Sequence, residues 1–215
     1  MRHPERDRPP NGTPETHHAM RILGIDPGSI HCGYGLIAHT TPRQRSTGTP
    51  APVTQLLRYS YLSSGRIVLP QSRPLHVRLR EMYTSLSDVI ADFRPDEIVI
   101  ERMFFAKGTK SAISLGHTRG VVLLAASLSG ITIYEYSPLE VKKAVVGYGR
   151  ADKRQTELMV RQILKISHHL SPDSADALAL ALCHAQSKEV LAAAGKPGMQ
   201  TPRFRNMRRA SQGRG

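Results

Sequence analysis

The chain has 215 residues, enough for one domain with a sizeable core or at most two small ones. Its formal net charge of +13 favours an acidic partner, with nucleic acid first among the candidates. No run approaches the roughly 20 apolar residues of a membrane span, and the polar N-terminus lacks the apolar core of a signal peptide. The two cysteines, Cys32 and Cys183, lie far apart without metal-type spacing. We therefore expect a cytoplasmic protein.

The two ends of the chain differ in composition from its middle. Residues 1–20 have the composition of a disordered extension. Residues 187–215 contain 7 Lys or Arg and 1 acidic residue, which is the composition of a basic disordered tail. The folded domain is expected between them, at 21–186. Within it, residues 101–165 carry 11 Lys or Arg against 5 Asp or Glu. Because these basic residues belong to the folded part, they are stronger evidence for nucleic-acid binding than the basic residues of a disordered tail.

The first predicted elements are strands. An apolar run at 22–25 predicts a buried strand, and Pro27-Gly28 predicts a tight turn. A second strand-like run at 34–37 follows with hairpin spacing. Residues 40–54, rich in Pro, Thr, Ser and Arg, predict a mobile loop before a third strand within 56–69.

Helices and strands alternate in the rest of the chain. Apolar residues at spacings of three and four predict an amphipathic helix at 75–93, and the continuous apolar run that follows predicts a buried strand at 97–100. One more strand is expected at 131–136, and further helices at 111–128, 138–146, 151–166 and about 173–185. This order predicts an α/β fold, a mixed sheet with helices on both faces. Gly116 and Gly120 share a face of their helix, which allows close packing in the core or between subunits.

Acidic residues stand at two strand ends and at the start of the last helix. Asp26 ends the first strand and Glu101 the fourth, so both emerge at one sheet edge if these strands are parallel neighbours. Asp173 and Asp176 share a helix face, although such a pair alone is also a capping pattern. Oxygen ligands that converge select Mg²⁺ or Mn²⁺, and two such ions about 4 Å apart support phosphodiester cleavage. In a strongly basic chain, these four acids predict the catalytic, metal-binding site of a nuclease.

Several blocks of the sequence resemble the RuvC-type Holliday junction resolvases. The first reads Gly-Ile-Asp-Pro-Gly-Ser, and the collinear matches lie at 24–29, 33–35, 100–104, 115–120, 145–149 and 173–179. The resemblance implies a ribonuclease-H-like fold with a five-stranded sheet, and a homodimer. It also implies Mg²⁺-dependent, symmetric nicking of four-way DNA junctions in recombination and repair, leaving 5′-phosphate ends. The same four acids match the metal-binding acids of the family.

The resemblance also implies DNA contacts and a protein partner. Phe104 matches an aromatic residue that stacks on bases, a contact worth about 1–3 kcal/mol per base. Lys107 and Lys110 stand near it and are expected to bind DNA. Lys142 and Lys153 match positions that contact the DNA backbone or support cleavage. Family analogy adds the RuvA–RuvB branch-migration complex as a partner.

Three alternative functions fit the sequence less well. An ATPase of the actin and Hsp70 type opens with a similar turn but needs a duplicated second domain, and 215 residues without an internal repeat cannot hold it. A zinc site is disfavoured because the histidines and cysteines lack ligand spacing. A non-catalytic four-way-junction-binding protein of the same fold is the remaining alternative, disfavoured because all four acids are present.

Overall fold

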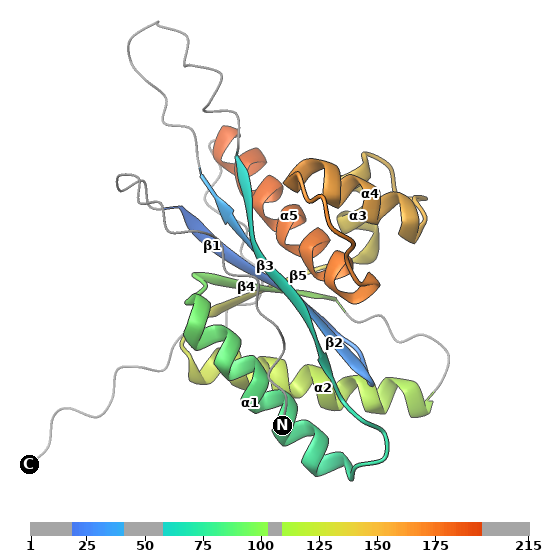
Figure 1. The fold of residues 1–215 in the computed structure, drawn as a ribbon. Coiled ribbons are helices and arrows are strands. Elements are labelled where there is room, and N and C mark those ends of the chain that lie inside the picture. The colour runs from blue at the N-terminus through green and yellow to red at the C-terminus, as the bar shows by residue number, and fades with distance from the viewer. Residues whose placement is uncertain (1–18, 41–57, 103–108, 195–215) are drawn as a thin grey trace, which may run out of the picture.

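A single five-stranded sheet organises the protein (Figure 1). The computed structural model describes residues 19–40, 58–102 and 109–194, without the side chains of 109–111. The strand order is β3-β2-β1-β4-β5, with β2 antiparallel to β1 and β3, and β4 parallel to β1 and β5. The strands are β1 (Met20–Pro27), β2 (His31–His39), β3 (Tyr59–Val68), β4 (Glu97–Glu101) and β5 (Thr132–Tyr136). The predicted mixed sheet, with its first and fourth strands as parallel neighbours, is confirmed.

Helices cover both faces of the sheet, as in ribonuclease-H-like proteins (Figure 1). One face packs against α1 (Leu75–Phe93) and α2 (Thr109–Leu128), and the other against α3 (Pro138–Val146), α4 (Lys153–Leu164) and α5 (Pro172–Ala193). Side chains alternate along each strand, so Leu23 and Ile25 of β1 join the α1–α2 core while Ile22 joins the α5 core. Asp26 therefore points to the α5 face. In the described part of the chain, no helix is both long and apolar enough to cross a membrane.

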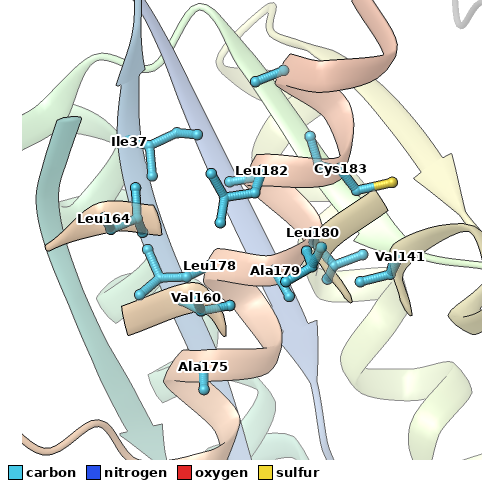
Figure 2. Packing of buried hydrophobic residues seen from close by; sticks show 14 of the residues in the cluster. Ile37, Val141, Val160, Leu164, Ala175, Leu178, Ala179, Leu180, Leu182 and Cys183 are labelled. Atoms are coloured by element: carbon cyan, nitrogen blue, oxygen red, sulfur yellow. The ribbon is translucent and has the colours of Figure 1, made fainter. Parts of the chain in front are cut away.

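Helix α5 is the most buried helix of the fold. Its Ala- and Leu-rich middle lies between the sheet and the α3–α4 pair, so apolar residues are needed on nearly all of its sides. Figure 2 shows Leu178 and Leu182 packed near Ile37 of the sheet, with Val160 of α4 and Val141 of α3 on other sides. Burying a Leu side chain stabilises the fold by about 1.5–3 kcal/mol. This packing fixes where α5 begins.

Three glycines bring α5 into direct contact with the sheet backbone. A Cβ at Gly24 of β1 would lie 1.9 Å from the main-chain oxygen of Ala177. A Cβ at Gly33 of β2 would lie 2.1 Å from the main-chain oxygen of Asp173. A Cβ at Gly35 would overlap Leu178 in the same way. No other residue fits at these positions without moving the helix, so the glycines set the height of α5 above the sheet.

Helix ends differ from the sequence-based prediction at two places. The helix expected at 151–166 is shorter, because Asp152 caps its start with Gln155 in a capping box and Lys165 ends it in the left-handed conformation. Helix α5 is longer than expected and runs past the boundary set at residue 186, so the expected tail does not begin at 187. The N-terminal extension was expected at 1–20, but Met20 already belongs to β1. Residues 1–18, most of the expected 40–54 loop and the tail from 195 lie outside the described residues.

Candidate active site

Asp26 and Glu101 are neighbours at the carboxyl ends of parallel strands. The β1–β4 register pairs Ile25 with Ile100, so the next residue on each strand is one of these two acids. Both lie on the face that α5 covers. Gly33, the register partner of Asp26 on β2, leaves room for the first turn of α5, which brings Asp173 over the same edge. Asp176 follows one turn later. The structure thus brings together the four acids that the sequence singled out.

The other three acids are near enough to Asp26 to affect its pKa. Burial, followed by repulsion from Asp176, Glu101 and Asp173, raises the pKa of Asp26 to about 7. The ammonium of Lys153 acts in the opposite direction. Both burial and the three neighbouring acids therefore oppose ionisation of Asp26 in the site as it stands. Such a site favours a bound cation.

Glu101 is fixed by its strand and by an arginine of α2. Arg119 donates from Nη1 to the main-chain oxygen of Glu101 at 2.6 Å and also pairs with the carboxylate of Glu135. Burial and the charge of Asp176 raise the pKa of the Glu101 carboxyl group, while Lys153, Arg119 and Lys142 lower it. Lys142 of α3 therefore lies near enough to act on this acid, as expected of a basic residue beside the site.

Lys153 reaches into the acidic cluster from the start of α4. Its Nζ donates to Oδ2 of Asp176 at 3.0 Å, although 81% of the lysine side chain is exposed. The hydrogen bond and the charge of Asp176 raise the pKa of Lys153, to which Asp26 and Asp173 also contribute. Lys153, which the family resemblance matches to a position that contacts the DNA backbone or supports cleavage, is thus in contact with one of the four acids.

Two basic residues at the site were missed by the sequence analysis. His31 of β2 and Arg66 of β3 both approach Oδ2 of Asp173, with Nδ1 and Nη1 respectively at 3.9 Å. Neither residue belongs to a recognisable motif. Their position follows from strand register, which pairs Arg66 with Gly33, and no local sequence signal gives that pairing.

The remaining predicted DNA-binding residues are only partly covered by the structure. Phe104 and Lys107 lie outside the described residues. Lys110 is placed in the first turn of α2, and its side chain is not described. The DNA-binding roles of these three residues, and of Lys142 and Lys153, stay predictions.

The donor set of the site suits a hard divalent cation. All four acids offer carboxylate oxygens, the ligands that Mg²⁺ and Mn²⁺ prefer, and no thiolate or imidazole completes a zinc set with them. In the described part of the chain, no three or more His, Cys, Asp or Glu side chains are close enough to one another to hold a metal ion. Cys32 and Cys183 are both free and buried. The chemistry of the four acids, with oxygen donors alone, therefore fits Mg²⁺ or Mn²⁺.

Comparison with known proteins identifies the family. The family model described as crossover junction endodeoxyribonuclease RuvC matches residues 22–184. The chain belongs to the RuvC family. RuvC of Caldicellulosiruptor saccharolyticus is 41% identical over 166 residues, which cover 77% of this chain and 92% of the relative. RuvC of Syntrophotalea carbinolica is 44% identical over 166 residues, covering 77% and 94%. The resemblance inferred from the sequence blocks is confirmed.

Solved structures agree with this assignment to the RuvC family. The T. thermophilus RuvC structure in complex with a Holliday junction substrate matches with a TM-score of 0.67 and 32% identity, over 77% of this chain and 93% of that one. The yeast mitochondrial Holliday junction resolvase Ydc2 matches with a TM-score of 0.52 at 13% identity, over 78% of each chain, which shows the shared fold alone. The ribonuclease-H-like fold expected from the sequence is thereby confirmed.

Proposed function

We propose that the crossover junction endonuclease activity of this RuvC-family chain is Mg²⁺-dependent and is carried by Asp26, Glu101, Asp173 and Asp176. The observation that supports this most is the convergence of four carboxylates on one sheet edge, where burial and then repulsion from the other three acids raise the pKa of Asp26 to about 7. The four acids would hold two Mg²⁺ ions, which Mn²⁺ can replace. The ions would supply Lewis-acid stabilisation of the charge that develops on the scissile phosphate. The products would carry 5′-phosphate and 3′-hydroxyl ends.

The chain's own residues position these acids and balance their charge. Helix α5 presents Asp173 in its first turn, where the helix dipole stabilises negative charge. Arg119 holds the end of β4 and so fixes Glu101. The ammonium group of Lys153 donates a hydrogen bond to Asp176. Most of the lysine side chain is exposed, so it can also contact a DNA phosphate. Lys142 adds positive charge on the same side of the acids.

DNA would lie over this edge of the sheet. Phe104, Lys107 and Lys110 follow β4 in the chain and would contact the DNA near Glu101, with Phe104 stacking on a base. Lys142 and Lys153 would contact the backbone from α3 and α4. Such contacts are expected to make junction binding weaken steeply as salt concentration rises.

We also propose a homodimer, since paired nicks in a symmetric junction need two active sites. One face of α2 offers a suitable surface. Ile113, Leu124 and Leu128 are 60%, 52% and 59% exposed. Gly116 and Gly120 lie between them on the same face, where an added Cβ would meet nothing within 4 Å. A second copy of α2 could approach closely over these glycines. A partnership with a RuvA–RuvB complex rests on the family resemblance, and the cytoplasmic location remains an expectation from the sequence.

The test is cleavage of a synthetic four-way junction and of a linear duplex with Mg²⁺, Mn²⁺ or EDTA. We expect symmetric, metal-dependent nicks with 5′-phosphate ends on the junction only. Asp26→Asn should abolish cleavage while junction binding persists. Asp88→Asn, which removes an exposed acid of α1, should cleave like the wild type. Binding without cleavage under either ion would instead support the non-catalytic junction-binding alternative.

A further inference from the structure

The strand register places a basic residue in line with the catalytic acids. Neighbouring positions on β4, β1, β2 and β3 form a row across the sheet, occupied by Glu101, Asp26, Gly33 and Arg66. His31 lies two residues before Gly33 on β2 and therefore points to the same face. Gly33 has no side chain, and the first turn of α5 fills the space above it. Arg66 thus stands on the far side of Asp173 from Asp26.

The contacts of these two basic residues are too loose to lock Asp173 in place. Both nitrogen–oxygen distances are 3.9 Å, longer than a hydrogen bond, whereas Lys153 lies 3.0 Å from Asp176. The side chains of His31 and Arg66 are 39% and 42% exposed. Ion pairs of this kind contribute little to stability. Their accessible nitrogens remain free to bind an anion from solution.

We propose that Arg66 and His31 form a phosphate-binding site for the DNA backbone on the β2–β3 side of the catalytic acids. The proposal rests on the proposed function, because it extends the same substrate-binding edge. A phosphate that approaches the four acids meets a negative field, which Lys142 and Lys153 offset only from the α3–α4 side. Arg66 and His31 offset it from the opposite side.

Cation binding at the acids would favour this phosphate contact. Once a divalent cation neutralises Asp173, the attraction between its carboxylate and the two basic groups falls. The guanidinium of Arg66 can then turn to a phosphate, which it binds through a planar fork of two N–H donors. The imidazole of His31 can donate a further N–H to the same phosphate or its neighbour. The DNA backbone would be held on both sides of the cleavage site.

The experiment measures junction affinity in Mg²⁺ as a function of salt, in an Asp26→Asn background that binds without cutting. Arg66→Ala should weaken binding about tenfold and lower the salt slope by about 0.9, the value for one lost phosphate contact. Arg66→Lys should keep the slope and recover most of the affinity. Arg66→Gln provides a second neutral variant in case the alanine variant folds poorly. Arg58→Ala, the control, removes the same charge at the opposite end of β3. Its junction affinity and salt slope should equal those of the Asp26→Asn protein.

Single-turnover cleavage in the wild-type background separates the possible outcomes. We expect Arg66→Ala to need more protein for half-maximal cleavage, with a maximal rate within about threefold of the wild type. A lower maximal rate with unchanged affinity and salt slope would mean that Arg66 only supports Asp173, and would overturn the proposal. Unchanged binding and cleavage would overturn it as well. Failure of the wild type to cut junctions would refute the proposed function instead.

Discussion

Substitution of Gly33 by alanine tests whether the contact between α5 and the sheet sets the geometry of the active site. The new Cβ would lie 2.1 Å from the main-chain oxygen of Asp173 and 2.9 Å from its Cβ. An ordinary contact needs 3.4 Å, so the start of α5 must move by about 1.3 Å. The clash is with backbone, so no rotamer change relieves it. Asp173 would move away from Asp26.

The expected effect on cleavage is larger than the effect on folding. A displacement of about 1 Å in a catalytic group can cost about 100-fold in rate, so single-turnover cleavage of a labelled junction should fall by about that factor. Overpacking should lower the free energy of unfolding by about 1–3 kcal/mol, measured by urea denaturation. Junction binding should change little, because Gly33 carries no side chain that could contact DNA.

Gly149→Ala is the matched control. Its Cβ would overlap a neighbour to a similar extent, at 2.2 Å, but that neighbour is Cδ1 of Leu139, the end of an exposed side chain. The leucine can rotate away, so stability and cleavage should stay close to wild type. Wild-type cleavage by a folded Gly33→Ala variant would show that the close approach of α5 does not determine the position of Asp173.

Three further predictions follow from the same structure. Asp26→Asn should raise the free energy of unfolding in EDTA at pH 8 by about 4 kcal/mol, because a carboxyl group whose pKa is raised in the folded state, here from 3.8 to about 7, destabilises that state once it ionises. A less stable variant would contradict this. Burial would raise the pKa of Glu97, but hydrogen bonds from His184 and Lys188 outweigh it and lower the pKa to about 2. About 3 kcal/mol of stability should therefore be present at neutral pH and be lost as pH falls from about 4.5 to 2, and denaturation of Glu97→Gln should lack that loss. Leu124→Glu should convert the proposed dimer to a monomer in sedimentation velocity, while Val190→Glu, equally apolar and exposed at the end of α5, should leave it intact.

The sequence was informative wherever the signal is local. Apolar runs predicted the strands, and the acids that follow the strands at Asp26 and Glu101 were recognisable because parallel strands end at one edge of a sheet. The spacing of Asp173 and Asp176 predicted a shared helix face, which the structure shows in α5. These features predicted which acids could share a site, on the condition that the first and fourth strands are parallel neighbours, as the structure shows.

The features that were missed depend on pairing between distant segments. Helix α5 was expected to end before residue 187, because the composition changes there. Its last turns are held by contacts that no local pattern shows, from Lys188 to Glu97 and from Glu189 to His39, which are 91 and 150 residues away. The position of Arg66 beside Asp173 likewise follows from the β2–β3 register. Spacing along the chain does not contain this information.

Strand β4 and helix α5 carry the acids that repel one another, and also a network of hydrogen bonds that holds the two elements together. On β4, Glu101 lies at one end among the acids, and Glu97 at the other end accepts hydrogen bonds from α5. On α5, the two aspartates lie in the first turns, and His184 lies near the middle. Burial lowers the pKa of His184, whose Nε2 lies 2.7 Å from Oε2 of Glu97 and whose Nδ1 lies 2.8 Å from the hydroxyl of Tyr136, each within hydrogen-bond distance. Because α5 is bound to β4 through these groups and to β1 and β2 through the glycines, repulsion among the acids cannot separate the two elements. The acids are thereby held together at one edge of the sheet.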